Sequence, residues 1–319
     1  MKQFKYILDP GSKKYTCPAC QKKTLVKYKD AETGNYLDDQ YGRCDREINC
    51  GYFTDPYSNG FNKSESATID THTPKPIMQD IPFEVLKGTL QGYEQNTFIQ
   101  NLLKRFPAEN IEQAISMYYL GTVTDKYMRG AVTFPFIDHQ NKIRAVQVKQ
   151  LDKDNHTVKT SFLHSIIERQ SEIIPAWIKA YNNNEKKVSC LFGEHLLNWY
   201  PHSPIALVEA PKTAIYGALH YGLPADADNL LWLAVYNLSS LNAEKCKALK
   251  NRYVLLFPDL SKDGRAFKLW SDKAKELNKK IPGAKFFVSD LLEKNATPEQ
   301  RNQGADIADL IETIPACIE

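Results

Sequence analysis

The chain has no apolar run that approaches the ~20 residues a membrane-spanning helix requires. Its amino terminus, MKQFKYILDP, lacks the apolar core of a secretory signal peptide. Net charge is also small, at +3 over 319 residues, so nucleic-acid binding cannot be concluded from charge alone and any such surface must be a local patch. These absences predict a cytoplasmic protein that makes no use of a membrane.

Cysteine is sparse, and its distribution is informative. Of seven cysteines, four lie within the first 50 residues and three are scattered farther along the chain. In a reducing compartment this layout favours metal binding over disulfides. The sequence also lacks the GxxxxGK[ST] loop of a helicase motor, so any helicase must be a separate protein. Hydrophobic residues make up 42% of the chain, which is ordinary for a globular protein, and its length accommodates two or three domains.

Residues 1–53 are predicted to form a zinc ribbon. Two residues separate Cys17 from Cys20, five separate Cys44 from Cys50, and a β-hairpin predicted between the pairs returns one pair to the other. Zn²⁺ prefers four tetrahedral soft ligands, and a unit of this size needs such a staple because its core is too small. The wide second spacing is the weak point of this interpretation, and four unlinked cysteines are the alternative to it. Basic and aromatic side chains alternate in this segment, as they do in proteins that bind single-stranded nucleic acid. Acidic side chains lie among them, however, so a solvent-exposed surface that binds no nucleic acid explains the pattern equally well.

Residues 54–82 are rich in Ser, Thr, Asn and Pro, and the composition predicts a flexible linker. The following segment, 83–203, is predicted to be an α+β subdomain. Two stretches of helical periodicity come first, and then alternating apolar and polar residues over 131–138 and 142–152 predict a β-hairpin.

Three short apolar runs in the C-terminal part predict buried parallel strands. They span 205–208, 230–235 and 253–257, each without polar alternation and each followed by a helix-like segment. Glu209 and Asp259 stand where the first and third runs end. In an open α/β sheet the carboxyl ends of the strands line the ligand crevice. Two carboxylates ~4 Å apart repel by ~4 kcal/mol at an effective dielectric of 20, so a cation between them is expected.

Further charged residues stand at predicted helix starts near these strands. Asp306 and Asp309 open the last predicted helix, where aspartate is often only a cap for backbone N–H groups. Combined with Glu209 and Asp259, Asp306 becomes a candidate third member of one acidic cluster. Lys212 begins the helix after Glu209, where it is either a phosphate contact or a lysine without function.

Three segments of this region, VEAPKTA, FPDLSKDG and GADIADL, resemble the three acidic motifs of the Toprim domain, which bacterial and phage primases, topoisomerases and some nucleases share. With the cysteine cluster and the phrase CLFGEHLL before the first strand, the chain resembles zinc-ribbon/Toprim primase-like proteins of bacterial mobile elements and phages. The resemblance extends from the cysteines to Asp309. It implies an α/β protein in which a Toprim domain with a Rossmann-like parallel sheet, 204–319, follows an α+β primase-like subdomain, 83–203, and an N-terminal zinc ribbon.

The resemblance also implies an activity, that of a DNA primase-like, metal-dependent nucleotidyltransferase. Its partners would be single-stranded DNA, nucleoside triphosphates and a separate replicative helicase. Glu209, Asp259 and Asp306 would be catalytic and would bind Mg²⁺ or Mn²⁺, while zinc would be structural. Nucleotide or DNA contact would fall to Arg144, Lys149, Lys159 and Lys212. For the first three, exposure on the solvent face of a half-buried sheet is an equally good interpretation.

One motif departs from the Toprim pattern Asp-x-Asp-x-x-Gly. Asp259 and Gly264 are correctly spaced, but Ser261 stands in place of the second acid, and Asp263 replaces it as a magnesium ligand only if the loop bends differently. A hydroxyl binds Mg²⁺ far more weakly than a carboxylate. Two alternatives therefore stay open: a non-catalytic DNA-binding replication accessory, and a Toprim nuclease. The ribbon favours a primase over a nuclease, because simple hydrolysis has no use for a template-reading module.

Overall fold

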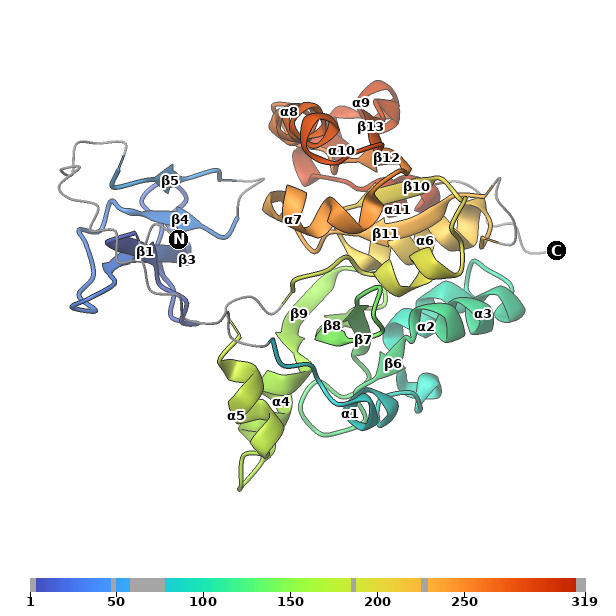
Figure 1. Cartoon of the computed structure of the whole chain (residues 1–319), viewed down its shortest axis with the longest axis horizontal. Coiled ribbons are helices and arrows are strands. Elements are labelled where there is room, and N and C mark those ends of the chain that lie inside the picture. Colours follow the sequence, from blue (N-terminus) through green and yellow to red (C-terminus); the bar gives the residue numbers. More distant parts are fainter. Residues whose placement is uncertain (1–3, 47–49, 58–77, 185–187, 225–228, 314–319) are drawn as a thin grey trace. The chain divides into compact units, whose positions relative to one another are not determined.

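The computed structural model describes residues 4–46, 50–57, 78–184, 188–224 and 229–313. The chain divides into two compact units, Met1–Lys75 and Pro76–Glu319 (Figure 1). The linker was predicted over 54–82, and most of it, residues 58–77, lies outside the described residues. In the described part, every helix is too short or too polar to cross a membrane.

The first unit is a small antiparallel β-structure. Its strands are β1 (Tyr6–Leu8), β2 (Tyr15–Thr16), β3 (Lys23–Asp30), β4 (Gly42–Cys44) and β5 (Phe53–Thr54). The sheet order is β1-β3-β4-β5, and β2 also pairs with β3. Cys17, Leu25 and Cys44 are fully buried and form its core, so two cysteines occupy positions that larger apolar side chains fill in bigger domains.

The second unit begins with helices and an antiparallel sheet. The helices are α1 (Phe83–Lys87), α2 (Thr97–Leu103), α3 (Ala108–Tyr118), α4 (Leu163–Gln170) and α5 (Ala176–Asn182), with a 3₁₀ turn η1 (Tyr93–Gln95). The strands, in sheet order, are β6 (Gly121–Thr122), β7 (Val132–Ile137), β8 (Ile143–Leu151) and β9 (Thr157–Phe162). The hairpin predicted over 131–138 and 142–152 is confirmed as β7 and β8.

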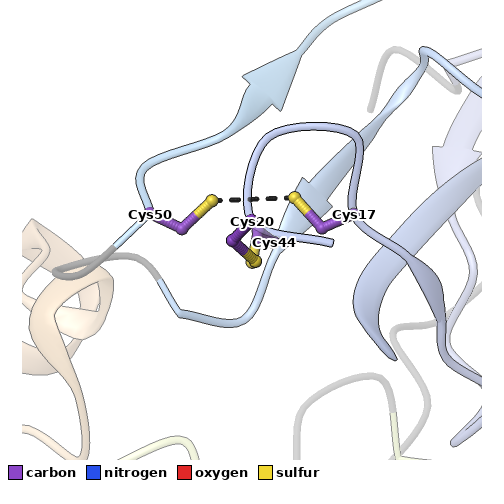
Figure 2. A group of neighbouring side chains, drawn as sticks. All are labelled: Cys17, Cys20, Cys44 and Cys50. Carbon is purple, nitrogen blue, oxygen red and sulfur yellow. Dashed lines mark hydrogen bonds between the residues drawn. The ribbon is translucent and has the colours of Figure 1, made fainter. Parts of the chain in front are cut away.

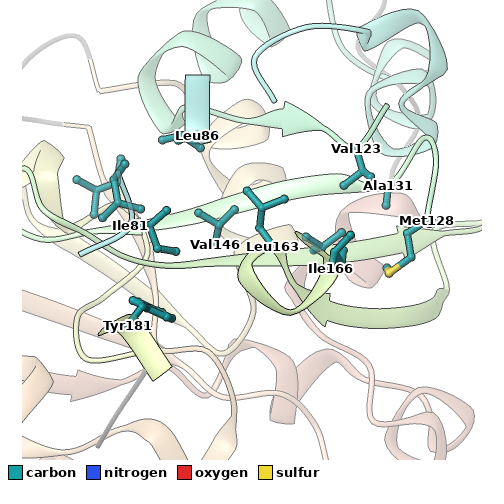
Figure 3. Close-up of a cluster of buried hydrophobic side chains, with 12 residues drawn as sticks. Ile81, Leu86, Val123, Met128, Ala131, Val146, Leu163, Ile166 and Tyr181 are labelled. Carbon is teal, nitrogen blue, oxygen red and sulfur yellow. The ribbon is translucent and has the colours of Figure 1, made fainter. Parts of the chain in front are cut away.

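A cluster of buried side chains joins this sheet to its helices (Figure 3). Val146 and Val148 of β8 pack with Leu163 and Ile166 of α4 and with Leu86 of α1, all at most 6% exposed. Burying an aliphatic side chain of this size contributes about 1.5–3 kcal/mol. These contacts hold the middle of β8 against α1 and α4.

The second unit ends with a four-stranded parallel sheet. Its strands are β10 (Ile205–Val208), β11 (Leu231–Ala234), β12 (Tyr253–Phe257) and β13 (Lys285–Val288), in the order β11-β10-β12-β13. The helices are α6 (Pro211–Tyr221), α7 (Ala243–Cys246), α8 (Arg265–Lys280), α9 (Leu291–Asn295), α10 (Pro298–Gln303) and α11 (Ile307–Glu312), with 3₁₀ turns η2 (Glu194–Asn198), η3 (Leu238–Ser240) and η4 (Lys247–Leu249). The three predicted strands are confirmed within one residue of their expected bounds.

Close packing positions α6 on this sheet. A Cβ added to Gly217 would lie 2.3 Å from the ring of Trp232, so only glycine lets the helix approach β11 so closely. Helix α6 also packs against α3 and α11. The antiparallel and the parallel sheet thus belong to one unit, and the hydroxyl of Tyr118, in α3, donates to the carbonyl of Trp232, in β11. The boundary expected between 83–203 and 204–319 falls inside this unit and stays a prediction.

Candidate functional site

The four N-terminal cysteines form one cluster in the structure. Their sulfur atoms all lie within 4.8 Å of one another. Figure 2 shows Cys17 facing Cys50, with the sulfurs 3.6 Å apart, while those of Cys20 and Cys44 are 3.9 Å apart. Cys17 and Cys44 are buried and the other two are partly exposed. Four cysteine sulfurs gathered so closely fit a structural zinc ion, for which tetrahedral sulfur coordination is usual.

The first pair of predicted acidic residues lies at the carboxyl edge of the parallel sheet. Strands β10 and β12 are neighbours, and Val208 pairs with Phe257 at their ends. Glu209 follows β10 directly and is 4% exposed. The backbone N–H of Asp259, two residues beyond β12, donates to Glu209 Oε1 at 3.4 Å. The two carboxylates therefore come from adjacent strands and lie side by side.

Asp259 has a strongly perturbed environment. Burial raises the pKa of its carboxyl well above the usual range, and the negative charges of Glu209, Asp306 and Asp309 raise it further against the opposing effect of Lys212. Its Oδ1 atom is buried and accepts no hydrogen bond from the residues that the structure describes. A buried acceptor left unsatisfied costs about 1–3 kcal/mol. A cation beside Asp259 would remove this cost, so the site fits a metal ion.

Asp306 has two roles at once. Its Oδ1 accepts from the Asp309 backbone N–H at 3.0 Å, and Asp309 Oδ2 accepts from the Asp306 N–H at 2.9 Å, which makes a reciprocal cap at the start of α11. Its Oδ2 accepts from the Thr213 hydroxyl at 2.6 Å. Because Asp306 also raises the pKa of Asp259, it is a helix cap and a neighbour of the acidic pair.

The acidic side chains do not converge as tightly as the cysteines. Throughout the described ranges, the cysteines are the one set of three or more metal-type side chains with all donor atoms within 4.8 Å of one another. Glu209, Asp259 and Asp306 consequently form a looser cluster.

Two of the four predicted basic residues accompany these acids. Lys212 Nζ lies 3.5 Å from Asp309 Oδ1 and 3.9 Å from Asp306 Oδ2. Burial lowers the pKa of Lys212, but the surrounding carboxylates, with Asp306 foremost, outweigh burial and raise it. The pKa of Lys149, on β8, is lowered to about 8 by burial and by the charge of Lys212, against the opposing effect of Asp306 and Asp259. The antiparallel sheet thus contributes a cation to the edge of the parallel one.

The other two basic residues have partners elsewhere. Arg144 Nε lies 2.6 Å from Asp138 Oδ2, and its Nη1 lies 3.6 Å from Asp80 Oδ1. The Lys159 ammonium lies 4.1 Å from the centre of the Tyr127 ring, a cation–π contact. Their predicted contact with nucleotide or DNA stays a prediction.

The structure explains why a serine can stand at position 261, where the Toprim pattern has its second acid. Ser261 is fully buried, and its hydroxyl accepts from the Ala266 N–H at 3.0 Å in the first turn of α8. Asp263 is exposed and ion-paired with Arg265, with Nη2 and Oδ2 2.8 Å apart. This pairing offers no support for Asp263 as a replacement metal ligand. Sequence reasoning missed Thr213, which with Tyr216 is one of two hydroxyl-bearing residues among the buried residues of α6.

Several solved structures to which the chain is similar are structures of primases. The primase fragment of the bacteriophage T7 primase-helicase is 15% identical with a TM-score of 0.36, and the match covers 86% of this chain and 88% of that one. The DnaG catalytic core is 17% identical with a TM-score of 0.42, covering 72% and 83%. The zinc-binding and RNA polymerase domains of Aquifex aeolicus primase are 13% identical with a TM-score of 0.33, covering 96% and 83%. These values are low, and the likeness concerns the fold alone.

Sequence comparison adds two family models. No curated protein matches the chain. A zinc β-ribbon finger model matches residues 4–66, which confirms the predicted N-terminal zinc ribbon. The second model matches residues 96–260, more than half of the chain. The chain therefore belongs to the family described as "Domain of unknown function (DUF6371)".

Proposed function

We propose that this protein is a DNA primase-like, metal-dependent nucleotidyltransferase that acts on single-stranded DNA in mobile-element or phage replication. One observation carries the proposal: Glu209 and Asp259 lie together at the carboxyl ends of adjacent parallel strands, and a buried oxygen of Asp259 has no hydrogen-bond partner among the residues that the structure describes. The three acidic motifs and the zinc ribbon support it from the sequence. A cytoplasmic location is part of the proposal.

Glu209, Asp259 and Asp306 would hold Mg²⁺ or Mn²⁺. The bound ion would neutralise charge on the phosphates and stabilise the attacking and leaving oxygens of a nucleotidyl transfer. Thr213 orients one oxygen of Asp306 by its hydrogen bond. The buried carboxylate of Glu209 is the candidate to accept the proton of the attacking hydroxyl, a general-base role.

The two lysines of the site suit a triphosphate. Lys212 stands at the start of α6, where backbone N–H groups attract phosphate, and Lys149 lies within electrostatic reach of it. The zinc ribbon would contact the DNA template, and a separate helicase would supply unwinding. Arg144 and Lys159 remain candidates for contact with the template backbone.

Primer synthesis tests the proposal. Purified protein with zinc bound, single-stranded DNA, ribonucleotides and Mg²⁺ or Mn²⁺ should yield short RNA products. Asp259→Asn should reduce the rate by about 100-fold or more, the usual loss when a charge-stabilising group is removed from a reaction centre. The matched control is Asp263→Asn, which changes an exposed aspartate of the same loop and should retain the activity. Wild type without product, where a known primase is active, would contradict the proposal.

A second candidate function is a non-catalytic DNA-binding accessory, favoured by Ser261. Its hydroxyl is committed to the first turn of α8, so the position of the missing acid is structural. This alternative predicts zinc-dependent, salt-sensitive binding to single strands that Glu209→Gln leaves unchanged. Plasmid cleavage that Asp259→Asn abolishes would instead identify a nuclease.

A further inference from the structure

Lys212 lies inside the acidic cluster and not on its rim. Its side chain is 13% exposed and its ammonium lies 3.5 Å from Asp309 Oδ1 and 3.9 Å from Asp306 Oδ2. Pro211 begins α6 and Lys212 is its second residue, three positions after Glu209. The backbone therefore delivers the lysine and the first acid of the cluster from the same turn.

Asp306 is saturated in this arrangement, whereas Asp259 is not. One oxygen of Asp306 accepts from the Asp309 N–H, and the other accepts from the Thr213 hydroxyl and faces Lys212. Asp259, by contrast, has a buried oxygen without a hydrogen-bond partner among the described residues. A cation attracted by Asp259 and Glu209 would therefore meet an Asp306 whose charge is already compensated.

We propose that Lys212 acts as the resident counter-ion of Asp306 in the free protein, so that a divalent ion can use Asp306 only after Lys212 has moved away. An ammonium and a divalent ion on one carboxylate repel each other strongly in a partly buried site. The inference rests on the proposed function, since the ion is the metal of that function.

An anionic ligand gives Lys212 an alternative partner. Phosphate at the start of α6 would attract the ammonium, and Lys149, which has no ion pair in the described part of the chain, would add to the attraction. Release of Asp306 would then make the site more negative for the divalent ion. Phosphate-bearing ligand and metal should consequently bind cooperatively, each raising the affinity for the other.

Mn²⁺ titration of the full chain with zinc bound, followed by the electron paramagnetic resonance of free Mn²⁺ in phosphate-free buffer, tests the inference. Lys212→Met should bind Mn²⁺ about tenfold more tightly than wild type, since about 1.4 kcal/mol of competition is removed. Lys212→Arg keeps the charge and should bind as wild type does. Lys268→Met removes an exposed lysine of α8 and should also match wild type. Equal or weaker binding by Lys212→Met overturns the inference.

The same titration with Asp259→Asn separates the inference from the proposed function. Wild-type binding that Asp259→Asn abolishes and Lys212→Met leaves unchanged would overturn the counter-ion role of Lys212 alone. Absence of Mn²⁺ binding in every variant would overturn both. Inorganic phosphate should tighten Mn²⁺ binding by wild type and leave Lys212→Met unaffected, whereas equal effects on both proteins would contradict the coupling.

A measurement on the wild-type protein tests the inference without depending on whether a variant folds. Amine acetylation, quantified residue by residue by mass spectrometry, should increase at Lys212 when Mn²⁺ is added, because the displaced ammonium becomes accessible. Lys268 serves as the internal reference. Unchanged labelling of Lys212 at saturating Mn²⁺ would contradict the inference.

Discussion

The cysteine cluster and the acidic cluster are both candidate metal sites, and they differ in how closely their ligand atoms approach. Four sulfur atoms lie within 4.8 Å of one another in the ribbon, while Glu209, Asp259 and Asp306 do not converge to that extent. Neutral thiols can crowd together without a counter-charge, but ionised carboxylates cannot. The acidic site instead separates its charges by hydrogen bonds and by Lys212.

From this difference we expect the ribbon to need zinc in order to fold. The second unit, in contrast, should fold without a divalent ion and bind one at the acidic cluster as a ligand. In the described part of the ribbon, the core cluster consists of three buried residues, two of them cysteines. The acidic cluster belongs to a unit with an extensive core of its own. Four predictions can break or sharpen this comparison.

The largest effect is expected from removing zinc. Apparent binding energies of structural zinc are ~10–16 kcal/mol, so chelation should unfold the first unit and leave the second unit folded. Nuclear magnetic resonance or limited proteolysis can follow the two units separately. Cys44→Ser should act as chelation does. A ribbon that stays folded without zinc would contradict the claim that its folding requires the ion.

A smaller effect is expected from Asp259→Asn in metal-free protein. Asparagine carries no charge, so the substitution removes a buried negative charge that Glu209, Asp306 and Asp309 repel, and it should stabilise the second unit by about 1–3 kcal/mol at neutral pH. The folded-state pKa of Asp259 is raised, so the folded protein holds a proton that the unfolded chain releases, and stability falls as pH rises from the unfolded pKa toward the folded one.

Thermal melts between acidic and neutral pH measure this effect. Wild type should lose more stability than Asp259→Asn as pH rises through that interval. Identical pH profiles would show that Asp259 is solvated and would remove the electrostatic argument for a cation. Added Mn²⁺ should raise the melting temperature of wild type and have no effect on the variant.

Ser261→Ala should have a moderate effect on stability and none on metal binding. The buried hydroxyl accepts from the Ala266 N–H, and loss of such a hydrogen bond costs about 0.5–1.5 kcal/mol. Chemical denaturation measures the change, with Ser239→Ala, at an exposed position, as the control. Weaker Mn²⁺ binding by Ser261→Ala would mean that the serine is a ligand after all.

The smallest effect is expected from Asp263→Asn. The side chain is exposed and forms an ion pair with Arg265, two residues away, so stability and Mn²⁺ affinity should both stay at the wild-type value. Isothermal titration with Mn²⁺ is sufficient. A clear loss of affinity would restore Asp263 as the replacement for the missing acid.

Local patterns made much of the fold predictable. The apolar runs at 205–208 and 253–257 coincide with β10 and β12, since fully buried parallel strands need continuous apolar sequence. The alternation over 131–138 and 142–152 identified the hairpin of β7 and β8, although β7 is buried at every position and not on one face alone. Strand order was not predictable, because nothing local requires β12 to lie beside β10.

The composition of the site was predictable only in part. Arg144 and Lys149 were grouped together, yet they are five positions apart on β8, and side chains at odd separations point to opposite faces of a strand. That signal was present in the sequence. The proximity of Lys149 to Lys212 was not, because it depends on how the antiparallel sheet packs against the parallel one.

The central claim is that Glu209 and Asp259 bind a divalent ion together at the edge of the parallel sheet. An anomalous difference map from a crystal of the protein soaked in Mn²⁺ tests it most directly. The account predicts a peak in contact with both carboxylates. A map with no peak there at saturating Mn²⁺, and both carboxylates neutralised by lysine alone, would contradict it.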